Sequence, residues 1–233
     1  MTTESPPVEA TEVPPVTAAE TAETKQAHKL NRKWTFWFDN QSRPKQGAAW
    51  GSSLRKAYTF ETVEEFWSLY DQIFKPSKLT VNAEFHLFKA GIEPKWEDPE
   101  CANGGKWTAM SSRKANLETM WLETLVCHGK HYVGSFLAKD AHILFAGWAP
   151  FGQLMALVGE QFDGSAEDIC GVVASVRVRS QDKLSLWTKT ATNEAAQMGI
   201  GRKWKEIIDT EKISYSFHDD SKRERSTKSR YTV

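Results

Sequence analysis

Two tryptophans, Trp50 and Trp96, lie in short polar segments instead of apolar runs. Glycine follows the first and prolines bracket the second, so each ring is expected on a loop. A large aromatic ring on a loop has few neighbours to bury it, and its face is available to stack on a flat ligand. Glu97 follows Trp96 directly and offers a carboxylate to the edge of such a ligand. This combination suits a planar, positively charged ring that donates hydrogen bonds, such as an alkylated purine.

Taken alone, these residues also allow a less specific interpretation. A tryptophan beside glycine or proline is more often partly buried than a ligand platform, and a loop carboxylate such as Glu97 is usually solvated. The same holds for Arg177 and Lys183, which by themselves are solvated strand and turn residues. A wider pattern is therefore needed to assign them to a site.

Composition restricts the class of protein. The chain has 233 residues, of which 40% are hydrophobic and 26% charged, as in ordinary globular domains. Thirty basic residues balance thirty acidic ones. Proteins that coat nucleic acid without sequence preference usually carry a basic excess, because neutralisation of phosphates drives that binding. Any nucleic-acid contact should therefore be local. No apolar run approaches the roughly 18 residues of a membrane helix, so no membrane association is expected.

Cysteines and histidines do not indicate a metal or cofactor site. The three cysteines have no CxxC spacing, and their odd, sparse count favours a reducing compartment. Cys101 and Cys170 are candidates for a reversible disulfide, although two unpaired thiols are the preferred interpretation. The six histidines show no HxxxH spacing, and we find no nucleophile–base pair or phosphate-binding glycine loop. We therefore expect no cofactor, no metal and no enzymatic activity.

Hydrophobic periodicity predicts a mixed fold. Alternating or β-branched segments predict strands at 34–38, 58–60, 84–88, 106–110, 169–178, 183–188 and 213–217. Helical stripes are found over 63–74, 117–125 and 193–208, and Thr62 with Glu65 forms a capping-box signature before the first of them. Residues 1–27 have almost no large apolar side chain and are expected to be disordered. Several strands with three helices predict an α+β domain with a largely antiparallel sheet.

Several ordered motifs resemble one family. They are Trp34–Phe38, Thr62–Trp67, Gly91–Asp98, Trp121–Leu125, Gly159–Phe162, Trp187–Thr188 and Ile200–Arg202. All are similar to motifs of the eukaryotic translation initiation factor 4E family of mRNA cap-binding proteins. The segments Cys101–Trp107 and Phe217–Asp220 most resemble the plant "iso" form. The resemblance covers residues 28–125 and 155–233.

The resemblance implies a fold and a cap site. It implies one cap-binding domain over residues 28–233, in which a curved antiparallel sheet of about eight strands is backed by three helices. The cap would lie on the concave side. Trp50 and Trp96 resemble the rings that sandwich the 7-methylguanine, Glu97 the carboxylate on the guanine edge, Arg177 and Lys183 the cations that hold the phosphates, and Trp187 the ring that touches the methyl group. The turn over 178–182 is one residue longer than usual, so Arg179 is an alternative to Lys183.

The resemblance also implies a protein partner. Val63, Trp67 and Leu122 are core residues by default, but the family pattern assigns them to the helical surface on which a 4G-type scaffold protein docks. The chain would act as a monomer within a heteromeric complex that recruits capped mRNA, without catalysis. It would be located in the cytoplasm, with the nucleus as a second compartment.

Residues 126–154 depart from the family pattern. They interrupt the helical stripe that ends at Leu125 and carry four glycines and a proline, so they are not helix-like throughout. A retained intron, an alternative transcript and a gene-model error are all consistent with this insertion. The helix would either end near Leu125 and restart near Leu154 or continue through a substitute turn. We expect scaffold binding to be more affected than cap binding, and the alternative function is a cap-binding splice variant that competes with productive initiation.

Overall fold

The computed structural model describes residues 27–40, 53–73, 75–111, 114–126, 162–178, 181–223 and 229–233. Four predictions lie outside these residues. They concern the tail before residue 27, the insertion beyond Val126, the ring of Trp50, and Arg179 as the alternative to Lys183.

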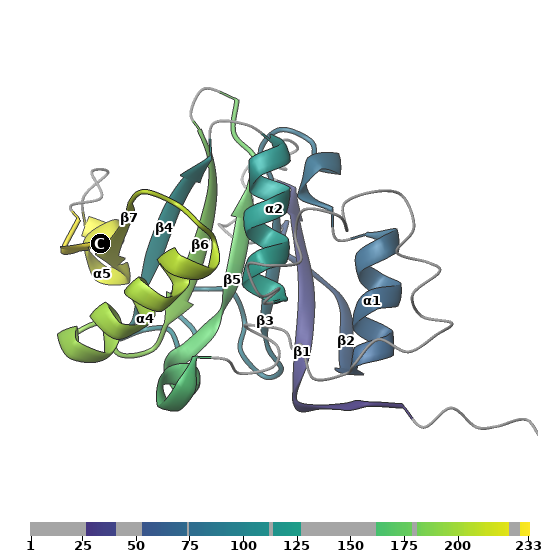
Figure 1. Ribbon diagram of the computed structural model, residues 1–233, viewed down its shortest axis with the longest axis horizontal. Helices are drawn as coiled ribbons and strands as arrows, with labels where there is room; N and C mark the ends of the chain where they lie inside the picture. Colours follow the sequence, from purple (N-terminus) through teal and green to yellow (C-terminus); the bar gives the residue numbers. More distant parts are fainter. Residues whose placement is uncertain are drawn as a thin grey trace, which may run out of the picture.

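Eight strands form one sheet in the order β2-β1-β3-β5-β6-β4-β7-β8 (Figure 1). The strands are β1 Lys29–Asn40, β2 Arg55–Thr62, β3 Ala83–Lys89, β4 Gly105–Ser111, β5 Ile169–Ser175, β6 Asp182–Thr188, β7 Ile213–Phe217 and β8 Tyr231–Thr232. Every neighbouring pair is antiparallel. The predicted α+β class and the antiparallel sheet of about eight strands are confirmed.

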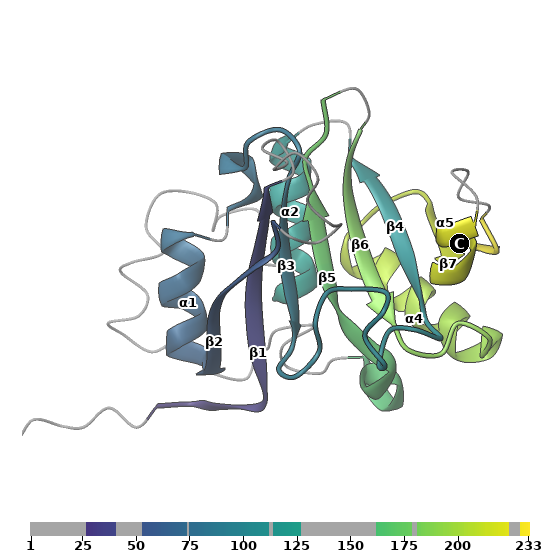
Figure 2. The ribbon, with the colours of Figure 1, turned by 180° about the vertical axis from the view of Figure 1, so that it is seen from behind.

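Three helices cover one face of this sheet, namely α1 Val63–Gln72, α2 Lys114–Leu125 and α4 Glu194–Ile207 (Figure 1). Seen from behind, the sheet lies in front of α2 and α4 (Figure 2). Short elements complete the order: η1 Pro76–Lys78, η3 Asp163–Asp168 and α5 His218–Arg223. None of the described helices is long and apolar enough to span a membrane.

The main core lies between the helices and the sheet. Its largest fully buried side chains are Trp34, Phe36, Phe60, Phe66, Leu87, Trp107, Leu117, Trp121, Trp204 and Tyr215. A hydrogen bond of 2.9 Å from the indole of Trp204 to the hydroxyl of Thr124 joins α4 to α2. Thr124 in turn donates to the carbonyl of Met120 at 2.7 Å. Helices α2 and α4 are thus fixed to each other as well as to the sheet.

The first helix begins where the sequence predicts. The hydroxyl of Thr62 accepts from the backbone of Glu65 at 3.3 Å, and the carboxylate of Glu65 accepts from the backbone of Thr62 at 3.2 Å. Ile73 was expected on the buried stripe, but it is 42% exposed. It is the C-cap residue, with φ −127° and ψ −41°, so the helical period no longer directs its side chain inward.

The C-terminal tail contains elements that the sequence did not predict. This tail contributes α5 and the edge strand β8. Tyr231 of β8 stacks on Tyr215 of β7 with ring centroids 5.5 Å apart. A two-residue strand has too few positions to show a period, so this contact, and not a local pattern, defines it.

Candidate functional site

The sheet face opposite the helices is rich in polar side chains. We call it the polar face and define it by three rows of paired residues. The first row is Asp39, Glu84, Ser175, Lys183 and Met110; the second is Trp37, His86, Val173, Ser185 and Thr108; the third is Thr35, Phe88, Gly171, Trp187 and Lys106. Because side chains alternate along a strand, each row lies on the face away from the main core. Most of these side chains are buried, whereas Lys106, Met110 and Lys183 keep part of their surface exposed.

Arg177 follows β5 and is held at the edge of the polar face. Its guanidinium forms an ion pair with the buried carboxylate of Glu84. The hydroxyl of Ser175 donates to the same carboxylate oxygen at 2.7 Å. The backbone N–H of Arg177 donates to Asp182 at 3.0 Å, which closes the β5–β6 hairpin. Arg177 and Lys183 therefore come from the two sides of one turn.

Lys106 is a third cation on this face and was missed from the sequence, where it was assigned only to a strand. Burial lowers the pKa of its ammonium, and the charges of Lys183 and Arg177 lower it further, whereas Glu84 opposes the shift. We call Arg177, Lys183 and Lys106 the cationic cluster. Its positive charges repel one another, and a bound anion would relieve that repulsion.

Trp187 lies beside this cluster but is almost buried, with 7% of its surface exposed. Its ring meets Phe88 edge-on at 5.5 Å and lies 4.3 Å from the ring of His218. It belongs to a second apolar cluster with Phe88, Ile92, Cys101, Cys170 and Val173. The structure therefore gives Trp187 a packing role, and only a small part of its ring is available to a ligand.

The segment 90–104 joins β3 to β4 and passes over the polar face (Figure 2). Cys101 from this loop packs in the second apolar cluster, which fixes the loop to the sheet. Cys101 and Cys170 are both free and buried. Hydrogen bonding to the Cys101 thiol, together with burial, raises the pKa of Cys170, so neither effect favours a reactive thiolate there.

Trp96 and Glu97 lie in a turn of this loop, the ring half-buried and the carboxylate exposed. The carboxylate of Asp98 accepts from the backbone N–H groups of Glu93 and Glu100, both at 2.9 Å. These bonds hold the turn from both sides. Asp98 is thus a positioning residue that sequence reasoning missed, although a short acidic side chain in a turn commonly bonds nearby backbone in this way.

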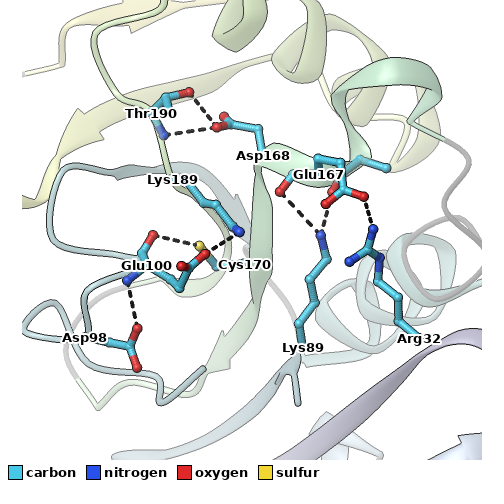
Figure 3. A network of polar contacts seen from close by, with 10 residues as sticks. Arg32, Lys89, Asp98, Glu100, Glu167, Asp168, Cys170, Lys189 and Thr190 are labelled. Atoms are coloured by element: carbon cyan, nitrogen blue, oxygen red, sulfur yellow. Dashed lines mark hydrogen bonds and ion pairs between the residues drawn. The ribbon is translucent and has the colours of Figure 1, made fainter. Parts of the chain in front are cut away.

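Polar contacts tie the loop to the strand ends (Figure 3). Glu100 forms an ion pair with Lys189, which follows β6, and hydrogen bonding to Lys189 lowers the pKa of Glu100. On the neighbouring strand end, the ammonium of Lys89 donates to the carbonyl of Ala166 at 2.7 Å. The loop that carries Trp96 is therefore fixed at its C-terminal end to the end of β6.

The three predicted scaffold contacts lie on the helical side. Val63 and Trp67 are on α1 and Leu122 is on α2, and all three are half-buried and pack against the main core. Trp67 meets Phe66 and Tyr70 edge-on, at 5.2 and 5.8 Å. Each of the three keeps part of its surface exposed, so a second role at the surface stays a prediction.

Comparison with known proteins identifies one family to which the sequence of this chain is similar. The model of the family "Eukaryotic initiation factor 4E" matches residues 29–135 and 148–232, and it leaves out 136–147 within the predicted insertion. A "eukaryotic translation initiation factor isoform 4E" of Capsicum annuum is 79% identical over 234 residues, covering 100% of both chains.

Solved structures are similar too. The complex of C. elegans eIF4E-3 with the 4E-binding protein Mextli and a cap analog has a TM-score of 0.68 and 32% identity, over 89% of this chain and 99% of that one. A schistosome eIF4E complexed with m7GpppG and 4E-BP has a TM-score of 0.70 and 26% identity, over 90% of this chain and 100% of that one.

Proposed function

This chain belongs to the eukaryotic initiation factor 4E family, and from this premise we propose that it binds the 7-methylguanosine cap of mRNA on its polar face. In the proposed complex it recruits the mRNA to initiation through a scaffold protein on its helical face. Its relatives support both parts, since one solved relative is complexed with m7GpppG and 4E-BP, and another with a cap analog and a 4E-binding protein.

The base is assigned to the turn of the 90–104 loop. A 7-methylguanine ring carries a delocalised positive charge, so an indole face offers it stacking and cation–π attraction of about 1–3 kcal/mol. Trp96 supplies one such face and Trp50 is proposed as the other. The exposed carboxylate of Glu97 would accept the two adjacent N–H donors of the guanine edge, which adds about 1.5–3 kcal/mol. Adenine lacks that pair of donors, so Glu97 would also supply specificity.

The phosphates are assigned to the cationic cluster, and this cluster is the observation that carries the proposal. Arg177, Lys183 and Lys106 come from three separate segments, and their charges influence one another. Gathering like charges costs free energy unless an anion binds them. A cap offers that anion next to its cationic base, and Trp187, which pairs with Lys106 across β4 and β6, is the candidate neighbour of the methyl group.

Retention on immobilised 7-methyl-GTP, compared with GTP, tests this assignment. We expect strong preference for the methylated nucleotide and a loss of about 5- to 150-fold in affinity for Trp96→Ala, corresponding to one stacked face. Glu97→Gln should weaken binding, whereas Glu93→Gln changes a carboxylate of the same loop that pairs with Lys95 and should not. Equal retention of GTP and 7-methyl-GTP by the unmodified chain would contradict the proposal.

Scaffold binding is assigned to Val63, Trp67 and Leu122. An amphipathic partner helix needs apolar anchors on a helical surface, and these half-buried side chains on α1 and α2 supply them. Trp67→Ala should weaken the binding of a scaffold-derived peptide and leave retention on 7-methyl-GTP unchanged. Retention also reports that the variant is folded. If Trp67→Ala bound the peptide normally, this surface assignment would be wrong.

A competitor is the second candidate function. Helix α2 ends at Leu125, three residues after Leu122, and the family match omits residues 136–147. An insertion beginning so close to the scaffold surface supports a variant that binds caps but recruits scaffold poorly. The test compares cap and peptide affinities of the chain with and without residues 126–154. A gain in peptide affinity on deletion supports the competitor, and equal affinities contradict it.

A further inference from the structure

Two carboxylates and a histidine meet at one end of the polar face. Asp39 is near the end of β1, and Glu84 and His86 are on β3. The β1–β3 register pairs Asp39 directly with Glu84, and His86 is two residues further along the same face. The three residues are only 6%, 8% and 5% exposed, respectively. Burying so many ionisable groups together requires compensation, because charged groups lose hydration there.

The geometry of these groups suits a tetrahedral metal ion. Each residue offers one ligand atom, and the three atoms lie within 4.8 Å of one another. Nε2 of His86 is 3.5 Å from Oε2 of Glu84. A tetrahedral zinc ion with bonds of about 2.1 Å holds two ligand atoms about 3.4 Å apart. The histidine and Glu84 are therefore already spaced as two such ligands, and a carboxylate oxygen of Asp39 lies within 4.8 Å of both.

His86 provides an independent indication of a ligand. Both of its ring nitrogens are buried and accept or donate no hydrogen bond within the described residues. Buried polar atoms are hydrogen-bonded in the large majority of cases, so an imidazole with two unsatisfied nitrogens calls for an explanation.

Glu84 links this cluster to the cationic cluster. Its Oε1 accepts from Ser175 and pairs with Arg177, whereas its Oε2 faces His86. One carboxylate can thus serve two cations at once, with one oxygen for each.

We propose that Asp39, Glu84 and His86 bind a divalent transition-metal ion of the zinc class. One imidazole and two carboxylates suit Zn²⁺, whereas Mg²⁺ and Ca²⁺ prefer oxygen ligands alone. Three protein ligands leave a fourth position for water. Because the ion would fix the carboxylate that holds Arg177, it would also order that side of the polar face.

Titration with Co²⁺, a spectroscopic substitute for Zn²⁺, tests the site on the full chain. We expect one Co²⁺ per chain with the visible absorption of a nitrogen–oxygen site and no thiolate charge-transfer band, which separates it from Cys101 and Cys170. His86→Gln and Asp39→Asn should each weaken binding at least about tenfold, in line with the loss of a metal-site partner. The control is His28→Gln, because His28 forms an exposed pair with Glu64 at 2.6 Å and should not matter.

Two readouts on the unmodified chain keep the proposal falsifiable if the buried variants do not fold. Zn²⁺ should raise its melting temperature, as expected for an ion that binds only the folded state. Crystals soaked in Zn²⁺ should show an anomalous peak between Asp39, Glu84 and His86. Absence of binding, a thiolate band, a peak elsewhere, or equal affinity in a folded His86→Gln variant would overturn the proposal. No readout uses a nucleotide, so the outcome is independent of cap binding.

Discussion

Lys106 is a residue whose proposed role in phosphate binding would come at the expense of stability. Its half-buried ammonium lies near Arg177 and Lys183, and burial is the main reason that its pKa is lowered. In the free protein this charge costs free energy, because hydration is lost and like charges repel. A bound phosphate would offset that cost. Sites that are strained for function are commonly stabilised when the functional group is removed.

Lys106→Met is therefore expected to have opposite effects on stability and binding. It keeps most of the aliphatic stem and removes the charge, so the melting temperature should rise. Affinity for 7-methyl-GTP should fall by about 10- to 150-fold, the equivalent of one charge-assisted bond of about 1.5–3 kcal/mol. Lys203→Met removes an exposed lysine of α4 on the other side of the sheet and should change neither quantity. Thermal melting and nucleotide titration measure both, and a destabilised variant with unchanged affinity would contradict the expectation.

The stability effect of Lys106 should also depend on pH. Its pKa in the folded chain is below the value of 10.5 for an unperturbed lysine. Between these two values the unfolded chain binds more protons, so stability rises with pH. The cost of the charge is fully present below the folded-state pKa and disappears above 10.5. The gain in melting temperature of Lys106→Met should be largest near neutral pH and should shrink as the pH approaches 10.5, and a gain independent of pH would argue against this origin.

Residues of the site differ in how well the sequence predicts them. Trp96 and Glu97 are neighbours along the chain, so their combination can be recognised directly. Lys106 and the Asp39–Glu84–His86 group are assembled by cross-strand register, and no spacing in the sequence brings them together. The expectation that the histidines form no metal site was based on their spacing along the chain. Such spacing does not detect ligands that come from two different strands.

At the scale of elements, the contact between α4 and the sheet depends on one glycine. Gly201 lies against the ring of Trp107 on β4, and a Cβ added at Gly201 would be 2.4 Å from that ring. Trp107 is fully buried and cannot move aside without displacing its neighbours. The close approach of helix and sheet therefore requires a residue without a side chain at this position.

A pair of glycine substitutions in α4 tests this packing. Gly201→Ala should lower the free energy of unfolding by about 1–3 kcal/mol, the usual cost of overpacking. Gly199→Ala, two residues earlier and exposed, meets nothing within 4 Å and should raise it by about 0.5–1 kcal/mol through better helix propensity. Denaturant titrations of both variants give the two values. Effects of the same sign would show that propensity, and not the contact with Trp107, decides the outcome.

Elements with a long hydrophobic period could be predicted, and those defined by tertiary contacts could not. The stripe of Leu117, Met120, Trp121 and Leu125 predicts α2, and all four side chains are buried. The helix α5 and the strand β8 are too short to show a period. Val178 was included in a predicted strand, yet β5 ends at Ser175 and Val178 is 63% exposed, because the chain leaves the sheet to form the turn.

For the whole molecule, a net charge of zero is compatible with a local group of cations on one side of the sheet. Thirty basic and thirty acidic residues balance over the chain, yet the polar face gathers the cationic cluster and the opposite face is covered by helices. The fold class could be predicted because alternation and helical stripes assign each residue to a side. The distribution of charge could not, since it depends on which strands become neighbours. The chain has a local cluster of cations but no excess of positive charge overall. We therefore predict that it binds the capped ends of RNA and not RNA in general.

Salt dependence of binding measures how many charges act locally. Each neutralised phosphate contact lowers the logarithm of the affinity by about 0.7 per logarithm of salt concentration, so the three cations of the cluster predict a slope of about −2 for a capped oligonucleotide. An uncapped oligonucleotide of the same sequence should bind far more weakly, because it lacks the stacked base. Lys183→Gln should make the slope shallower by about 0.7, and Lys203→Gln, on the helical side, should leave it unchanged. Equal slopes for capped and uncapped oligonucleotides with equal affinities would instead indicate a general RNA-binding protein.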